Sequence, residues 1–275
     1  MKQTHNQISY DYLYVLRPDI TDLPPVMSQL EVLSKKKRVK LICYFLSESS
    51  KQWLNQRGID YEYFGKENIH TSNKIKKIIR YLKYKNWLKF FLKQSNYDKL
   101  WVGSLESLIA IGKSVLKKEF ILNVYEIPET TGIKGYLSNK YGKKAKTIIV
   151  PEYNRSHIIR YMWKLKKTPI VIENKPLYLP NNDHVIKNTL LDKYISDGYK
   201  IILYQGIFNP ERDLKPLAKS LQIINEKYLF LLMTPFNKKE IDKIKDIYQH
   251  TLHIGFIPAP NHLSVTKIAH IGIAT

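Results

Sequence analysis

Residues 201–213, IILYQGIFNPERD, decide the fold that we expect for this chain. Their apolar run ends at Gly206 and is followed by a polar loop and a helix-period pattern, which predicts a strand, a tight turn and a helix start. Such a turn can cradle a phosphate, because glycine lets the backbone approach, the helix end is positive and Arg212 offers a planar fork of donors. The alternative is that Gly206 only closes a buried parallel strand.

Length and composition indicate a globular protein of the cytoplasm. The chain has 275 residues, of which 44% are hydrophobic and 25% are charged, values that suit one large domain or two average ones. No apolar run is long enough to span a bilayer, and the polar opening lacks the apolar block of a secretory signal. The single cysteine, Cys43, lies in an apolar run and is expected to be a buried, inert thiol.

The strongest compositional feature is positive charge, with 45 Lys and Arg against 24 Asp and Glu, a net charge of +21. Such a surface attracts polyanions, whether nucleic acid, anionic lipid headgroups or phosphorylated substrates. Charge alone does not choose among them. A compositional bias of the genome explains the excess of lysine equally well.

The first half of the chain alternates strand-like and helix-like segments, which predicts parallel βαβ units in a doubly wound α/β sheet. We expect strands at 10–16, 39–46, 61–64, 100–102, 120–127 and 147–150, and helices at 23–33, 51–56 and 105–116. Ligands of such sheets bind beyond the carboxyl ends of the strands. The side chains expected there are those of Arg17, Asp19, Ser47, Glu48, Ser104, Glu126 and Glu129.

The region 73–94 holds eight basic residues and no acidic one. Its apolar residues change sides near Lys83. The first face consists of Ile75, Ile78, Ile79 and Leu82, and the second of Tyr84, Trp87, Leu88 and Phe91. We therefore expect either a break in the helix near Lys83 or a second apolar face meant for another surface.

Aromatic residues opposite a lysine stripe suit a helix that lies in the headgroup region of an anionic membrane. The residues expected to face this membrane are Lys77, Arg80, Lys85, Trp87, Lys89, Phe91 and Lys93. The alternative is a solvated basic face over an ordinary core helix. Nucleic-acid binding is not expected, because no RNA- or DNA-binding motif accompanies the region.

The proline-rich stretch 170–180, IVIENKPLYLP, predicts an extended connection between two domains, 1–180 and 181–275. The second domain repeats the alternation, with strands expected at 201–205, 228–233, 252–256 and 271–274 and helices at 214–225, 238–248 and 263–270. A last parallel strand without a following helix leaves one face and one edge poorly covered. We therefore expect this domain to be incomplete and the native protein to continue past Thr275.

Several segments resemble the GT-B glycosyltransferases, in particular the retaining family 4 enzymes of cell-surface polysaccharide synthesis. ILYQG with Arg212, LFLLM, LHIGFIP and AHIGIAT are similar to the donor-binding domain of that family. VYEIPE at 124–129 is similar to its common VYDAHE motif, and PEYNRSHII at 151–159 with IENKP resembles its crossing between domains. The resemblance implies two Rossmann-like domains, with the acceptor side in 1–180 and a truncated donor-nucleotide-binding domain in 181–275.

The resemblance also implies functional residues. Gly206 would lie beside the donor diphosphate with Arg212 as the cation on it, and Gly255, Phe256 and Ile257 would form the loop that meets the nucleotide base. Glu126 and Glu129 would be carboxylates of the cleft and the candidate catalytic residues, although Glu129 suits a loop brace equally well.

The sequence also departs from the family. Ile207, Asp213 and Pro128 replace an arginine, a glycine and a histidine of its motifs. The family's acidic pair would lie beyond Thr275, so a protein that ended there would have weak or no activity.

The expected function is transfer of a sugar from a nucleotide diphosphate sugar to a lipid-linked or saccharide acceptor in cell-surface polysaccharide synthesis. The enzyme would be a cytoplasmic hexosyltransferase that can lie on the inner face of the cell membrane. No metal site or further cofactor is expected, because the eight histidines are scattered. Two alternatives stay open: a non-catalytic basic fragment that binds membranes or polyanions, and a nucleotide-sugar epimerase of the same fold.

Overall fold

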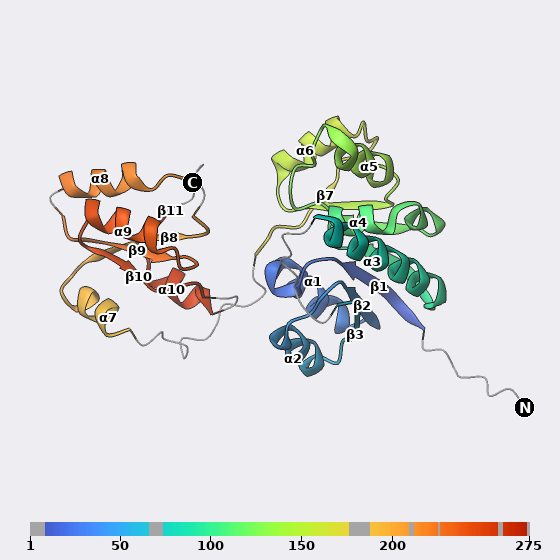
Figure 1. Cartoon of the computed structure of the whole chain (residues 1–275), viewed down its shortest axis with the longest axis horizontal. Helices are drawn as coiled ribbons and strands as arrows, with labels where there is room; N and C mark the ends of the chain where they lie inside the picture. Colours follow the sequence, from blue (N-terminus) through green and yellow to red (C-terminus); the bar gives the residue numbers. More distant parts are fainter. Residues whose placement is uncertain are drawn as a thin grey trace, which may run out of the picture. The chain divides into compact units, whose positions relative to one another are not determined.

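The protein forms two compact units, Met1–Pro176 and Leu177–Thr275, each built around its own sheet (Figure 1). The computed structural model describes residues 9–65, 74–175, 188–208, 212–224, 226–257 and 261–273. Every strand pair of these residues is parallel. Each unit is therefore an α/β fold of the doubly wound type.

The sheet of the first unit has seven strands in the order β3-β2-β1-β4-β5-β6-β7. They are β1 (Tyr10–Leu16), β2 (Val39–Cys43), β3 (Asp60–Tyr63), β4 (Tyr97–Val102), β5 (Phe120–Asn123), β6 (Thr147–Val150) and β7 (Ile170–Val171). The central strands are near-continuous apolar runs, as expected of parallel strands that are buried on both faces. Because the strand order reverses between β1 and β4, a crevice opens beyond their carboxyl ends.

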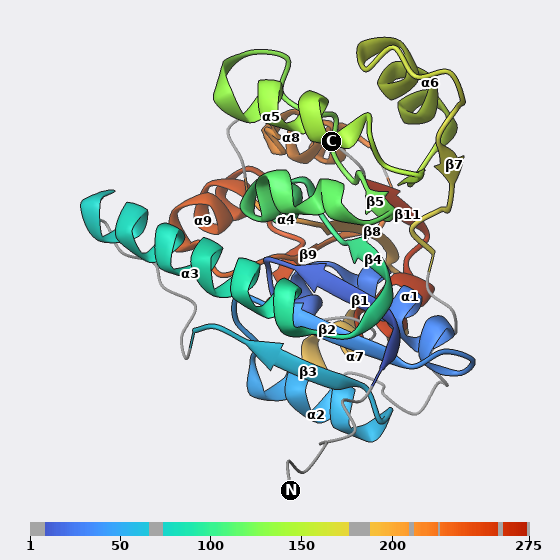
Figure 2. The same ribbon diagram turned by 90° about the vertical axis from the view of Figure 1, so that its right-hand side faces the viewer.

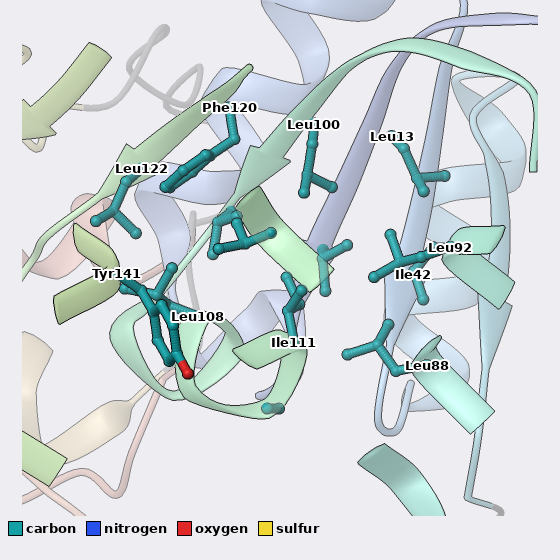
Figure 3. Close-up of a cluster of buried hydrophobic side chains, with 14 of the residues drawn as sticks. Leu13, Ile42, Leu88, Leu92, Leu100, Leu108, Ile111, Phe120, Leu122 and Tyr141 are labelled. Atoms are coloured by element: carbon teal, nitrogen blue, oxygen red, sulfur yellow. The ribbon is translucent and has the colours of Figure 1, made fainter. Parts of the chain in front are cut away.

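Helices cover both faces of this sheet (Figure 2). One face carries α1 (Pro24–Ser34) and α2 (Glu48–Gln56), and the other carries α3 (Lys74–Gln94), α4 (Leu105–Ile111), α5 (Gly132–Gly142) and α6 (Tyr153–Met162). Two 3₁₀ turns, η1 (Ile20–Asp22) and η2 (Gly112–Lys117), complete the unit. In the larger core, Leu88 of α3 and Leu108 of α4 point toward Leu100 and Phe120 of the sheet (Figure 3).

The second unit has four strands in the order β10-β9-β8-β11. They are β8 (Lys200–Gln205), β9 (Tyr228–Met233), β10 (Thr251–His253) and β11 (Ile271–Ile273). Helices α8 (Lys215–Ile223) and α9 (Lys238–Ile247) pack on one face, and α7 (Thr189–Ser196) and α10 (His262–Ile268) on the other. The strand order reverses between β8 and β11, so the turn after β8 lies at the switch point of this sheet.

The expected α/β fold with two Rossmann-like units is confirmed. Several expected elements end earlier than the sequence predicts, among them β2, which stops at Cys43 instead of residue 46. β5 stops at Asn123 instead of residue 127, and β10 stops at His253, before Gly255 turns with a φ of 81°. Helix α4 ends at Ile111, because the φ of 59° at Gly112 does not fit a continuous α-helix, and the expected remainder to residue 116 is the 3₁₀ turn η2. Residues 225 and 274 and the expected boundary at 180 lie outside the described residues.

The predicted break near Lys83 is wrong, because α3 runs without interruption from Lys74 to Gln94 and no glycine or proline lies within it. The second apolar face, which was the other expectation, is present. Ile78, Ile79 and Leu82 are 59%, 49% and 52% exposed on the outside of the helix. Tyr84 and Leu88 are fully buried on the opposite side.

Candidate functional site

A pocket of about 480 Å³ lies at the switch point of the first sheet. Its walls come from the segments that follow four adjacent strands: Arg17 and Asp19 after β1, Tyr44 after β2, Ser104 after β4 and Glu126 after β5. Lys77, Arg80 and Tyr81 of α3 complete the lining. The sequence placed the polar groups at these strand ends, but it gave no sign that α3 joins them.

Asp19 is a bracing residue of this pocket rather than a free carboxylate. It is buried, and its oxygens accept hydrogen bonds from the backbone N–H and hydroxyl of Thr21 and the backbone N–H of Ser47, at 3.0, 3.0 and 2.5 Å, and from the hydroxyl of Ser50. Burial raises the pKa of Asp19, but these hydrogen bonds outweigh it and the pKa is lowered. The ionised side chain therefore ties the loop after β1 to the start of α2.

The loop after β4 approaches β1 closely, and only glycine fits there. A Cβ atom on Gly103 would lie 2.6 Å from Cε1 of Tyr14 and 2.9 Å from Cδ1 of Leu16. The next residue, Ser104, caps α4 by accepting a hydrogen bond from the backbone N–H of Ser107 at 3.2 Å. The hydroxyl of Ser107 accepts from the backbone N–H of Arg17 at 2.8 Å, which fixes Arg17 at the pocket.

A buried polar network around Asn123 contacts the pocket through Tyr125. The amide nitrogen of Asn123 lies 2.9 Å from the Tyr14 hydroxyl, 2.7 Å from Gln29 Oε1 and 2.9 Å from the Tyr125 hydroxyl, and Asn123 Oδ1 accepts from Trp101 Nε1 at 3.2 Å. Tyr125 lines the pocket, and burial raises its pKa to about 12. Sequence reasoning missed this network, although an asparagine that ends an apolar strand was its signal.

The two candidate catalytic carboxylates are separated in the structure. Glu126 lines the pocket. Glu129 is exposed and lies 3.7 Å from Nζ of Lys134, and its backbone carbonyl packs against Gly135 of α5. Of the two residues, only Glu126 lies where a ligand of this pocket could reach it.

In the second unit, Gly206 and Arg212 meet at the carboxyl end of β8. A Cβ atom on Gly206 would lie 3.6 Å from Nη1 of Arg212. Arg212 also lines a pocket of about 410 Å³ together with Lys215, Lys243 and Asn237. This arrangement combines an accessible backbone turn with a cation, which are two of the features that bind phosphate. Helix α8 begins at Lys215, within one residue of the start that the sequence pattern predicts.

The loop after β10 carries Gly255, Phe256 and Ile257. It leaves the same carboxyl edge of the sheet as the Gly206 turn, with β9 between the two strands. Phe256 is 65% exposed, whereas Ile257 packs against the core beside α7 and α10. None of these three residues is among the described lining of the pocket at Arg212.

The residues predicted to face a membrane divide into three groups. Lys77 and Arg80 line the pocket of the first unit. Trp87 and Phe91 pack against the core, with ring centroids 5.4 Å apart, so these two rings face inward rather than outward. Lys89 and Lys93 are exposed, and Lys85 reaches back to Gly112.

Within the described ranges, no cluster of three or more His, Cys, Asp or Glu side chains is placed to hold a metal ion. In the same ranges, no helix combines the length and apolar character needed to cross a bilayer.

No family model matches the sequence, and no curated protein matches it. Solved structures do. The Anabaena protein Alr3699/HepE in complex with UDP-glucose aligns over 96% of this chain and 73% of its own, with a TM-score of 0.65 and 11% identity. A glycosyltransferase from Rickettsia africae aligns over 98% and 73%, with a TM-score of 0.61 and 14% identity.

A Listeria monocytogenes protein described as a UDP-N-acetylglucosamine 2-epimerase aligns over 97% of this chain and 73% of its own, with a TM-score of 0.64 and 12% identity. At such low identity the likeness concerns the fold. Two Rossmann-like units with parallel sheets, aligned along nearly the whole chain with these proteins, give this protein the GT-B fold.

Proposed function

We propose that the protein is a glycosyltransferase that moves a sugar from a nucleotide diphosphate sugar to a lipid-linked or saccharide acceptor in cell-surface polysaccharide synthesis. The observation that carries the proposal is the contact between the Gly206 turn and Arg212 at the switch point of the second sheet. The likeness to a structure that holds UDP-glucose, and to one titled a glycosyltransferase, supports it.

The leaving group of this reaction is a nucleoside diphosphate, on which negative charge develops as the sugar departs. Arg212 would balance this charge directly, and the positive end of α8 with Lys215 would add to it. Gly206 leaves the backbone open for the diphosphate to approach. The loop at Gly255, Phe256 and Ile257 would meet the base, since it leaves the same edge of the sheet.

In the first unit, we assign the acceptor to the pocket at the ends of β1, β2, β4 and β5. Glu126 would accept a hydrogen bond from the acceptor hydroxyl there. The reaction proposed uses the nucleotide sugar alone, without a metal ion or a further cofactor.

We also propose that the protein lies on the inner, anionic face of the cell membrane through α3. The exposed Ile78, Ile79 and Leu82 would enter the headgroup region, with Lys83 and Lys89 at its surface. This assignment moves the membrane contact from the aromatic face to the outer apolar face of the helix.

Isothermal titration of the full chain with UDP, GDP and their sugars tests the donor site. We expect Arg212→Ala to weaken binding about tenfold to a hundredfold, because a charge-assisted hydrogen bond contributes about 1.5–3 kcal/mol. Lys219→Ala on the exposed side of α8 is the matched control, since it removes the same charge outside the pocket. Equal nucleotide binding by wild type and Arg212→Ala would remove Arg212 from this role.

The likeness to the Listeria 2-epimerase favours one second candidate, a nucleotide-sugar epimerase. The two reactions differ in their need for an acceptor. An epimerase converts the sugar nucleotide alone into its epimer, whereas a transferase releases the nucleoside diphosphate when an acceptor is present. Product analysis with and without acceptor separates them, and nucleotide binding of either kind argues against a non-catalytic basic fragment.

A further inference from the structure

We infer that the pocket of the first unit binds a phosphate group carried by the acceptor. This inference deepens the proposed transferase function, and the identification of the ligand as the acceptor rests on that function. The phosphate site itself is argued from the residues that line the pocket. Three cations, Arg17, Lys77 and Arg80, line this pocket from two elements that are far apart in sequence.

These cations are available to a ligand. Within the part of the chain that the structure describes, none of the three forms an ion pair with a carboxylate. Elsewhere in the same unit basic side chains do find partners, as in Lys40 with Glu62 at 3.3 Å and Arg57 with Glu31 at 3.1 Å. Cations that gather in a concave site without carboxylate partners are typical of phosphate recognition.

The positions of the cations are set by the fold. The backbone N–H of Arg17 donates to Ser107 at 2.8 Å, and the Arg17 guanidinium lies 5.6 Å from the ring centroid of Tyr81. Lys77 and Arg80 stand one turn apart on α3, so both project from the same side of the helix. The Ser107 bond therefore fixes the backbone of Arg17 at the pocket, and α3 fixes the backbone positions of Lys77 and Arg80.

Four carboxylates, Asp19, Asp22, Glu106 and Glu126, line the same pocket, so the phosphate site is argued from the clustering of the three cations and not from a net positive charge. Asp19 is engaged by its own loop, as described above. Asp22, Glu106 and Glu126 come from η1, α4 and the segment after β5, whereas the cations come from the segment after β1 and from α3. A pocket with cations from some elements and carboxylates from others suits a ligand that carries both a phosphate and sugar hydroxyls.

Apolar and aromatic groups fill the rest of the lining, among them Tyr44, Phe45, Tyr81 and Leu23. A volume of about 480 Å³ with such walls fits a small molecule of one or two rings. A phosphorylated or diphosphate-linked sugar matches these features. Such a phosphate can belong to a lipid carrier or to a water-soluble sugar phosphate.

The test measures acceptor binding to the full chain in the absence of nucleotide. The probes are glucose 1-phosphate, an octyl diphosphate ester of glucose, and octyl glucoside as the neutral partner, each titrated at low and at physiological salt. The variant is Lys77→Gln with Arg80→Gln. Its matched control is Lys113→Gln with Lys117→Gln, which removes the same charge from the same unit at exposed positions outside the pocket.

We expect both phosphate probes to bind wild type at least about tenfold more tightly than octyl glucoside. The pocket variant should remove this preference, and the control should keep it. Tighter binding of the octyl diphosphate than of glucose 1-phosphate identifies a lipid-linked source, and the reverse order a soluble one. Either order supports the phosphate site.

The inference is overturned if the neutral and charged probes bind equally, if neither binds, or if the control loses as much affinity as the pocket variant. Titration with UDP runs beside each variant and reports on the donor site separately. If the phosphate probes bind and UDP does not, the phosphate site is supported and the transferase proposal is contradicted. If UDP binds and the phosphate probes do not, the transferase proposal is supported and the phosphate site is contradicted.

Discussion

Gly206 and Arg212 lie side by side at the carboxyl end of β8, with 3.6 Å between the Cβ position of Gly206 and Nη1 of Arg212. Any side chain at position 206 would therefore stand between the arginine and the turn. Gly206 does not have a positive φ, so the requirement for glycine here is one of space rather than of backbone conformation.

Gly206→Ala should weaken nucleotide binding about tenfold, because the added methyl group occupies the approach to the backbone and to Arg212. The same methyl group would lie 3.1 Å from the Tyr204 hydroxyl, which needs only a small shift, so the melting temperature should change little. Calorimetry with and without UDP measures both effects. Gly272→Ala, which meets no atom within 4 Å, is the control, and a similar loss of affinity in it would contradict the explanation.

Gly103→Ala should destabilise the first unit by about 1–3 kcal/mol, because its Cβ would overlap two buried side chains, Tyr14 and Leu16. All four tryptophans lie in this unit, so denaturation followed by tryptophan fluorescence reports on it selectively. Trp101 stacks on Tyr14 at 5.6 Å and gives a local signal. Gly272→Ala in the second unit should leave this transition unchanged.

Two buried tyrosines should respond in opposite ways to loss of the hydroxyl. The Tyr14 hydroxyl donates to Gln29 at 2.9 Å and accepts from Asn123 at 2.9 Å, so Tyr14→Phe should destabilise the unit by about 1–2 kcal/mol. Among the residues that the structure describes, the buried hydroxyl of Tyr84 has no hydrogen-bond partner, so Tyr84→Phe should be neutral or stabilise by up to about 1 kcal/mol. Urea denaturation of the two variants decides, and equal destabilisation would show that Tyr84 is bonded in solution.

The strands of both units could be predicted from the sequence, because a parallel strand buried on both faces leaves an apolar run that needs no knowledge of its partners. The same reasoning placed Arg17, Ser104 and Glu126 at one edge, since carboxyl ends of parallel strands meet there. Contacts between segments that are distant in sequence could not be predicted. Tyr44 and Phe64 pack around Tyr84 and Trp87, and these contacts join segments that no local pattern connects.

The orientation of α3 is the clearest example of a feature that the sequence alone could not predict. Its period identified two opposite apolar faces, but period alone cannot say which face meets the core. The aromatic face is buried because it fits the aromatic residues after β2 and β3, and the isoleucine face is left outside. Lys77 and Arg80, which the sequence had assigned to a membrane surface, consequently line the pocket.

Acid should destabilise the protein through Asp19. The pKa of Asp19 is lowered by its hydrogen bonds, so its contribution is fully present above the unfolded value of 3.8 and is lost as the pH falls through the folded pKa. Asp19→Asn should lose about 1–3 kcal/mol at pH 7, since the amide would place a donor against the donors of Thr21 and Ser47, and the loss should shrink below pH 4.

Ionisation of the neighbouring Asp22 should affect the stability of the fold in the opposite direction to that of Asp19. Burial, followed by the charge of Asp19, raises its pKa, so ionised Asp22 opposes folding and the effect is relieved as the pH falls. Asp22→Asn should therefore be neutral or stabilising at pH 7. Denaturation curves between pH 3 and pH 8 compare the two variants, and parallel pH profiles would contradict the assignment.

Membrane binding should depend on the outer face of α3. We expect wild type to float with vesicles that contain anionic lipid and not with neutral ones, because apolar insertion and lysine attraction act together. Ile78→Gln with Leu82→Gln should lower the bound fraction about tenfold, since two half-exposed apolar side chains would no longer enter the headgroup region.

The matched control is Ile133→Gln with Tyr136→Gln on α5, which also replaces two apolar side chains by glutamine, at still more exposed positions of the same unit. It should leave flotation unchanged, because the proposed membrane contact is made by α3 and not by α5. Trp87→Gln would be an unsuitable comparison, since Trp87 packs against the core and its loss would also destabilise the unit. If this α5 variant released the protein as strongly as the α3 variant, binding would follow general surface apolarity, and the assignment of α3 to the membrane would fail.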